Sequence, residues 1–359
     1  MKIISVMIVE DSRVVREFLE CIIERDPRLK VVASVGTGEE ALRVIRHAVP
    51  DVISMDIRLP GMNGLELTKR IMTEQPTPIV VVSSEVEDEE LKISMNALRA
   101  GALAVVQKPV GVSHADYEKV AQSLCTRLAI MSEVRVIRQR VSLRSEAVDV
   151  SLSAGLVKRM EDRVMVRRPA ILGLVASTGG PSALVKVLND LMANFPVPVV
   201  LVQHITPGFM RGFVKWLNEV VAQEVLEAEE GQRMEAGKVY VAPAECHLAM
   251  SERGVLRLDG SAMVSMQKPS GTVLFRSMAK VYGAEACGVL LTGMGEDGAL
   301  GMRDIHEAGG LTIAEHASTA VVYGMPAAAV ELGAVSEVLP LTQIGGRLNE
   351  VFGMKGSMT

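Results

Sequence analysis

The sequence predicts an α/β protein with two doubly wound parallel-sheet domains, and three observations support this prediction. Short apolar runs alternate with amphipathic helical patterns throughout the first 124 residues. This alternation stops in residues 125–168 and resumes at residue 169. A chain of 359 residues is also long enough to bury two separate hydrophobic cores.

The first domain, residues 1–124, contains five strand-like apolar runs. They cover residues 3–9, 31–35, 52–55, 79–82 and 102–106. Helical patterns over 14–24 and 38–47 separate the first three runs, and another helical pattern starts at Tyr117. Short apolar strands that alternate with helices are typical of a parallel sheet covered on both faces.

The second domain, residues 169–352, shows the same alternation. Its strands are predicted over residues 170–176, 197–202, 239–241, 288–291 and 311–314. Two further apolar runs, 248–250 and 255–258, are separated by a short polar segment and indicate an inserted β-hairpin.

The segment between the domains, residues 125–168, is basic. It carries ten Lys and Arg against five Asp and Glu, a net charge of +5 in a chain whose net charge is −5. A solvated basic linker is the preferred interpretation. The alternative is a surface that docks an acidic partner protein.

Composition excludes several classes of protein. No apolar run approaches the roughly 18 residues of a membrane span, and the amino-terminal run before Glu10 is too short for a signal peptide. We therefore expect a cytoplasmic protein without direct membrane insertion. The net charge of −5 indicates no general nucleic-acid role. The four cysteines are scattered and indicate neither a zinc site nor a disulfide framework.

Chemically active residues end the predicted strands of the first domain. Glu10 and Asp11 follow the first strand, Asp56 the third, Ser83 the fourth and Lys108 the fifth. Three carboxylates at one sheet edge repel one another unless a cation neutralises them, and such oxygen ligands suit Mg²⁺. The metal and Lys108 would offset the charge of a phosphoryl group on Asp56, and Ser83 would contact a phosphoryl oxygen.

Together these residues resemble the receiver domain of two-component response regulators, over residues 3–124, with a flavodoxin-like fold. The resemblance implies that Asp56 accepts phosphate from a histidine kinase, while Glu10, Asp11 and Asp56 hold Mg²⁺. It also implies a cis peptide bond between Lys108 and Pro109.

A serine, a histidine and an aspartate follow three strands of the second domain. The motifs are Ala176-Ser177-Thr178-Gly179-Gly180-Pro181, Val202-Gln203-His204 and Leu291-Thr292-Gly293-Met294-Gly295-Glu296-Asp297-Gly298. Ligands of open α/β sheets bind at the carboxyl edge, so these strand ends can bring together a nucleophile, a base and an orienting acid.

Each motif has an alternative interpretation. The glycines after Ser177 favour a tight turn into a helix whose N–H groups stabilise an oxyanion. A phosphate loop is disfavoured because G-x-G-x-x-G is not matched, and the G-x-S-x-G elbow is absent because Val175 replaces its first glycine. A single histidine such as His204, taken alone, is more often a hydrogen-bonded buried residue or a surface residue than a catalytic base. Asp297 alone is as consistent with a helix cap as with catalysis.

The combined motifs resemble the Rossmann-like catalytic domain of the chemotaxis response regulator protein-glutamate methylesterases, over about residues 169–352. Two further motifs belong to this resemblance, Leu274-Phe275-Arg276-Ser277 and Gly324-Met325-Pro326. It implies Ser177 as nucleophile, His204 as general base and Asp297 as the acid that orients it. Thr178 and Met294 are candidate oxyanion or cleft residues.

The implied activity is hydrolysis of γ-glutamyl methyl esters on methyl-accepting chemoreceptors through an acyl-enzyme, together with deamidation of receptor glutamines. The esterase reaction is expected to need no cofactor. A chemotaxis histidine kinase is the implied phosphodonor, and the unphosphorylated receiver is expected to cover the crevice at Ser177. The alternative hypothesis is a non-enzymatic adaptor that binds receptors while its receiver acts as a phosphate sink.

Four departures from the family pattern stand out. Glu10 stands where Asp is frequent, a substitution that many relatives share. Val105 occupies a position where receivers commonly carry a switch aromatic. Residues 267–272 end in Thr272 where relatives often have Asp, and His316 stands where an acidic residue is common. Thr272 and His316 are expected to border the substrate cleft.

Overall fold

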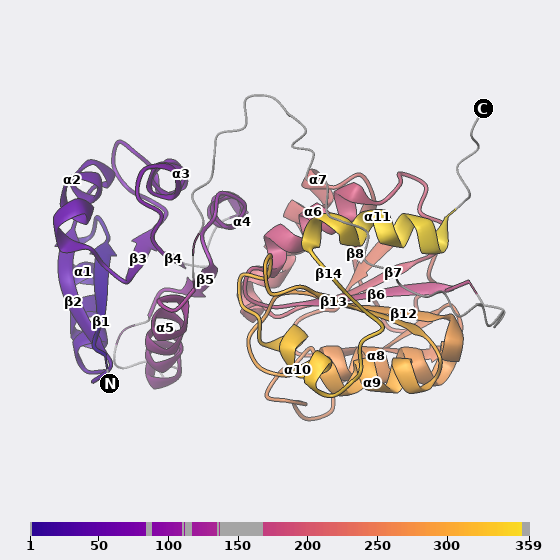
Figure 1. Cartoon of the computed structure of the whole chain (residues 1–359). Helices are drawn as coiled ribbons and strands as arrows, with labels where there is room; N and C mark the ends of the chain where they lie inside the picture. Colours follow the sequence, from indigo (N-terminus) through magenta and orange to yellow (C-terminus); the bar gives the residue numbers. More distant parts are fainter. Residues whose placement is uncertain are drawn as a thin grey trace, which may run out of the picture.

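The computed structural model of the chain describes residues 2–83, 88–109, 111, 117–134, 136 and 168–353. In these residues it contains two parallel sheets, each with helices (Figure 1), and a separate antiparallel hairpin. The predicted α/β fold class is confirmed. Most of the predicted linker, residues 125–168, lies outside the described residues.

The amino-terminal sheet has five parallel strands in the order β2-β1-β3-β4-β5, the order of flavodoxin-like folds. Its strands are β1 (Ile4–Val9), β2 (Leu29–Val35), β3 (Val52–Asp56), β4 (Ile79–Ser83) and β5 (Ala104–Gln107). Its helices are α1 (Arg13–Glu24), α2 (Gly38–Ala48), α3 (Gly64–Glu74), α4 (Asp88–Arg99) and α5 (Tyr117–Met131). The strands lie where the apolar runs predict them, and α5 continues beyond residue 124.

The second sheet has seven parallel strands in the order β14-β13-β12-β6-β7-β9-β8. Its strands are β6 (Ile171–Ala176), β7 (Val199–Gln203), β8 (Glu224–Glu227), β9 (Lys238–Val241), β12 (Ala286–Leu290), β13 (Leu311–Glu315) and β14 (Glu337–Leu339). The predicted hairpin is present as β10 (His247–Glu252) and β11 (Val255–Asp259). The sequence did not predict β8 and β14. Both are short, partly exposed edge strands and therefore lack an apolar run.

Helices cover both faces of the second sheet (Figure 1). One face carries α6 (Gly180–Asp190), α7 (Met210–Val220) and α11 (Leu341–Phe352), and the other carries α8 (Gly271–Tyr282), α9 (Ala299–Glu307) and α10 (Met325–Glu331). Because both faces are covered, the central strands β6, β7 and β12 are buried along their whole length. None of the described helices is both long and apolar enough to cross a bilayer.

The direction of strand addition reverses between β6 and β12. From β6 the chain moves outwards to β7, whereas the later strand β12 pairs on the opposite side of β6. Such a switch point leaves a crevice at the carboxyl ends of the two strands, where open α/β sheets bind their ligands. The loops after β6 and β12 are those that contain Ser177 and Asp297.

The amino-terminal domain packs against the second domain through α4. The indole N–H of Trp216 donates to Asn96 Oδ1 at 3.1 Å, and the hydroxyl of Ser182 donates to the carbonyl of Leu98 at 2.9 Å. Lys92 forms an ion pair with Glu219. One cluster of buried apolar side chains continues from the first domain into the second, so the two domains form a common interface.

Adjacent glycines on α11 provide a matched test of helix packing. A Cβ atom on Gly345 would collide with Asp190 Cβ on α6, whereas a Cβ atom on Gly346 would meet open space. We expect Gly345→Ala to lower the free energy of unfolding by about 1–3 kcal/mol through overpacking. Gly346→Ala should raise it by up to about 1 kcal/mol because alanine favours the helix. Urea unfolding of both variants checks this, and equal effects would contradict the α6–α11 contact.

Candidate functional site

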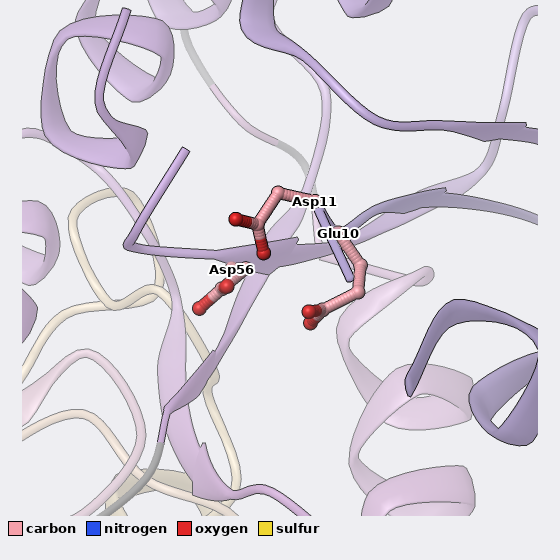
Figure 2. Close-up of side chains that lie close together, drawn as sticks. All are labelled: Glu10, Asp11 and Asp56. Carbon is pink, nitrogen blue, oxygen red and sulfur yellow. The ribbon is translucent and has the colours of Figure 1, made fainter. Parts of the chain in front are cut away.

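Three carboxylates meet at the carboxyl edge of the first sheet. Glu10 and Asp11 follow β1 and Asp56 ends β3, and these strands are neighbours. Oxygen atoms of the three side chains all lie within 4.8 Å of one another, and the side chains converge on one space (Figure 2). Glu10 and Asp56 are buried, whereas Asp11 is exposed. The predicted acidic cluster is therefore present.

Lys108 is the cation of this cluster. Its ammonium group lies 3.0 Å from Glu10 Oε2 and 2.9 Å from Asp56 Oδ2, so it bridges the two buried acids. Ser83 is buried at the end of β4, next to β3.

The expectation of a cis peptide bond before Pro109 is wrong, because the only cis peptide among the described residues is Lys268–Pro269. Lys108 and Pro109 are joined in the trans form, which is the more stable isomer for most X–Pro bonds.

The electrostatics of the cluster fit a divalent cation. Burial, followed by repulsion from Asp56, raises the pKa of Glu10 to about 7. Burial also raises the pKa of Asp56, despite the nearby Lys108 ammonium group. One lysine therefore does not fully compensate the crowded carboxylates, and their oxygen atoms are the ligands that Mg²⁺ prefers. The three carboxylates therefore form an acidic cluster of the kind that holds Mg²⁺.

Ser177 lies in a tight turn between β6 and α6. Gly179 adopts a φ of 77°, which favours glycine, and a Cβ atom on Gly180 would collide with the side chain of Gln203. The serine N–H donates to the carbonyl of Thr292 at 3.0 Å, which joins the turn to the loop after β12. These constraints hold the serine side chain at the switch point of the sheet.

His204 follows β7 and meets Asp297 across the crevice. Its Nε2 lies 2.9 Å from Asp297 Oδ2, and both side chains are buried. The other ring nitrogen, Nδ1, is buried without a hydrogen-bond partner in the described part of the chain. His204 and Ser177 line the same small cavity of about 30 Å³. The structure thus brings the three predicted residues to one edge.

Asp297 is held by the amino terminus of α8. Its Oδ1 accepts from the hydroxyl of Ser270 at 2.6 Å and from the N–H of Thr272 at 3.1 Å. Its Oδ2 accepts from the N–H of Gly271 at 2.6 Å, in addition to His204. Asp297 therefore occupies the anion site of a helix start, but the helix is α8 and not the one that follows it.

These donors determine the charge of Asp297. Burial by itself would raise the pKa of its carboxyl group, but the hydrogen bonds with His204, Ser270 and Gly271 hold the pKa below its ordinary value. Asp297 is therefore ionised at neutral pH, and its carboxylate holds the ring of His204 in position through the contact with Nε2. This is the role of the acid in a serine–histidine–aspartate arrangement.

A cavity of about 690 Å³ opens beside these residues. Ser177, Asp297 and Met294 line it, and Met294 is 48% exposed. The helix α5 of the first domain supplies another part of the lining, including Arg127. The guanidinium of Arg127 donates to Thr178 Oγ1 at 3.5 Å, so the first domain reaches the residue next to Ser177.

Comparison with known proteins identifies the family of the chain. The CheB methylesterase family model matches residues 172–348, and the response regulator receiver domain model matches residues 6–116. A protein-glutamate methylesterase/protein-glutamine glutaminase of Paramagnetospirillum magneticum is 51% identical over 356 residues, covering 98% of both chains. This chain belongs to the CheB methylesterase family. Its amino-terminal part is a response regulator receiver domain.

A second relative matches the whole chain, and a solved structure matches its carboxy-terminal domain. A protein-glutamate methylesterase/protein-glutamine glutaminase of Nitrosospira multiformis is 42% identical to this CheB-family chain and covers 98% of both sequences. The crystal structure of the Thermotoga maritima CheB methylesterase catalytic domain is 36% identical, with a TM-score of 0.49. It covers 51% of this chain and 98% of that one.

The hydrogen bond from Ser270 to Asp297 was not predicted from the sequence. Ser270 lies in the segment identified as a departure from the family pattern, and its position before α8 was the available signal for a helix cap. The expectation that Thr272 borders the cleft is wrong. It is buried behind Asp297, where its hydroxyl accepts from the N–H of Gly298 at 2.8 Å. His316 is exposed, pairs with Ser318 and does not line the 690 Å³ cavity.

The raised pKa of Glu10 gives a prediction for the Mg²⁺-free protein. The native carboxyl group titrates near pH 7 but the unfolded one near 4.5, so the native state binds more protons between these values. The contribution of Glu10 to the free energy of unfolding is fully present below pH 4.5. It is lost as the pH rises through 7, and the loss amounts to up to about 3 kcal/mol. Thermal unfolding in chelator from pH 5 to 8 measures the loss, and added Mg²⁺ should restore stability at pH 8.

The control for this prediction is Glu10→Gln, which has no titrating carboxyl group at this position. Its stability should change less between pH 5 and 8 than that of the wild type, and Mg²⁺ should stabilise it less. Equal pH slopes for the two proteins would show that Glu10 titrates normally.

Proposed function

We propose that this chain is a phosphorylation-activated cytoplasmic esterase that hydrolyses γ-glutamyl methyl esters on methyl-accepting chemoreceptors. The observation that carries the proposal is the pairing of His204 with the ionised Asp297 beside Ser177, at the switch point of the sheet. Membership of the CheB methylesterase family supports glutamyl methyl esters as the substrate class. Deamidation of receptor glutamines follows the same acyl-enzyme route, with ammonia in place of methanol.

The histidine is oriented for general-base catalysis through Nδ1. Its Nε2 is bonded to Asp297, so the unpartnered Nδ1 is the nitrogen that accepts the proton of Ser177. In the common serine hydrolase arrangement the two ring nitrogens have the opposite roles. The chemistry is unchanged, because the carboxylate still holds the ring in position and stabilises the imidazolium that forms.

Two backbone N–H groups are available for the oxyanion. The N–H of Ser177 is not one of them, because it donates to the carbonyl of Thr292. The N–H groups of Thr178 and Met294 have no acceptor among the described residues. Both residues flank the nucleophile, one in its own turn and the other in the cavity lining. This supports Thr178 and Met294 as the oxyanion residues.

The reaction then follows from the positions of these groups. Ser177 Oγ attacks the ester carbonyl while His204 takes its proton, and the tetrahedral oxyanion accepts hydrogen bonds from the free N–H groups. His204 returns the proton to the departing methoxide, which leaves as methanol. Water, deprotonated by His204, hydrolyses the acyl-enzyme and releases receptor glutamate.

The receiver supplies the regulation. We propose Asp56 as the phosphoacceptor for a chemotaxis histidine kinase, with Glu10, Asp11 and Asp56 as the residues that would hold Mg²⁺. The metal would supply positive charge that offsets the phosphoryl group. Lys108 and Ser83 would contact the phosphoryl oxygens. In the unphosphorylated arrangement α5 lines the cavity at Ser177 and Arg127 contacts Thr178.

Phosphorylation therefore acts by shifting a population between covered and open domain arrangements. The covered state is stabilised by contacts of α4 with α6 and α7, which bury Trp216. A rearrangement at the phosphorylated receiver that weakens these contacts exposes the cleft to a receptor segment. Val105, which lines the small cavity beside Ser177, places β5 directly at this interface.

Methanol release from methylated chemoreceptor membranes tests the esterase. Ser177→Ala should lower turnover by roughly 10⁴–10⁶-fold, as expected for loss of a triad nucleophile. Asp297→Asn should lower it by about 10⁴-fold, because the neutral amide no longer stabilises protonated His204. Thermal unfolding of each variant serves as the folding control. A wild-type protein that binds these membranes but releases no methanol would support the adaptor hypothesis instead.

Trp216 reports the switch without any label. It is the only tryptophan in the chain, is 2% exposed and is hydrogen-bonded to the receiver residue Asn96. A small phosphodonor with Mg²⁺ should therefore shift its fluorescence to longer wavelength as the interface opens. Asp56→Asn should show no shift. Esterase activation in the wild type without a change in fluorescence would show that opening at α4 is not the switch.

A further inference from the structure

An unusual turn stands at the mouth of the cleft. Val264 and Gln267 exchange backbone hydrogen bonds of 3.1 and 2.9 Å, which close a two-residue hairpin turn. The two central residues, Ser265 and Met266, have φ angles of 49° and 58°. Turns of this kind favour Asn-Gly, because positive φ is disfavoured for residues with a Cβ atom. The chain therefore holds a methionine in a conformation that suits glycine.

The turn is attached firmly to the catalytic edge. On one side, His247 is fully buried and its Nε2 lies 3.0 Å from the carbonyl of Ala262. On the other side, the N–H of Ser270 donates to Nδ1 of the same histidine, and the hydroxyl of Ser270 donates to Asp297. The position of the turn is thus determined by residues that also position the catalytic acid.

The side chain of Met266, at the tip of the turn, buries little surface when the chain folds. Met266 is 88% exposed, so it contributes almost nothing to the hydrophobic core. It lines the 690 Å³ cavity together with Met294, Ser177 and Asp297. Strained conformations that persist at the edge of a functional site are a recognised sign of a functional constraint. Packing within this chain does not account for a methionine at this position.

The opposite side of the cavity indicates the shape of a partner that Met266 would contact. The other side of the same cavity is lined by a helix, α5 of the receiver, through Ile130 and Met131. The mouth of the cleft therefore accommodates a helix, and apolar side chains of that helix. Glu296 and Glu331 are exposed in the same lining and disfavour an acidic neighbour. A methionine adapts to varied apolar surfaces because its side chain is flexible.

We infer that Met266 is a specificity residue that contacts an apolar side chain beside the methyl ester on a helical segment of the receptor. The receptor helix replaces α5 at the mouth of the cleft once the receiver moves away. This inference rests on the proposed esterase function. It assigns part of the receptor affinity to the side chain of Met266, separately from the chemistry at Ser177.

The test compares Met266→Gly with Ser265→Gly, because both remove strain from the same turn but only the first removes the methionine. Kinetics of methanol release are measured with methylated receptor membranes, full-length protein, phosphodonor and Mg²⁺. Met266→Gly should raise KM about fivefold to twentyfold, the loss expected for an apolar contact, and change kcat by less than about twofold. Ser265→Gly should keep the wild-type KM, and Met266→Leu should restore KM to within about threefold.

Thermal unfolding separates recognition from stability. The melting temperature of Met266→Gly should equal or exceed that of the wild type, since glycine suits the positive φ. A protein that is equally or more stable and yet has a higher KM supports the inference. An unchanged KM for Met266→Gly, or the same increase for Ser265→Gly, would overturn it. Absence of methanol release from the wild type would instead count against the proposed function.

Discussion

The burial of the Asp297 carboxylate is the constraint on which the catalytic edge depends. A charge that is 2% exposed must be compensated by hydrogen bonds, or it takes up a proton. Asp297 obtains this compensation from the start of α8 and from the hydroxyl of Ser270. The loop before α8 and the loop after β12 therefore have to be placed together. Thr272 joins them a second time through Gly298, and His204 takes its orientation from the result.

The two domains use buried carboxylates in opposite ways. Asp297 has several donors and a lowered pKa, so it remains a stable anion that orients a histidine. Glu10 and Asp56 share one lysine and have raised pKa values, so their site is poorly compensated without a further cation. The first arrangement suits a permanent catalytic element. The second suits a site that gains a metal ion and then a phosphoryl group, and such a site can change state.

The interface connects these two sites physically. Strand β5 and helix α5 belong to the receiver, yet Val105 and Arg127 line the same small cavity as Ser177. Receiver residues thus form part of the wall of the cavity at Ser177. The hydrogen bonds around Asp297, by contrast, lie entirely within the second domain.

The interior strands and the principal site residues could be predicted from the sequence. Strands such as β6 and β7 are buried on both faces and read as apolar runs, and Ser177 and His204 follow them directly. Parallel strands end at a common edge, so residues far apart in the chain could be assigned to one site. The edge strands β8 and β14 could not be predicted, because their partly exposed residues form no apolar run.

By itself, the sequence determined the fold class, the acidic cluster and the serine, histidine and aspartate, because apolar periodicity and strand ends are local properties. The tertiary structure decided which nitrogen of His204 faces Asp297, that Asp297 accepts hydrogen bonds from the first N–H groups of α8, and that Ser270 supports it. It also decided that the Lys108–Pro109 bond is trans and that Met266 stands at the cleft. These features depend on side-chain packing and backbone geometry, which local sequence patterns do not encode.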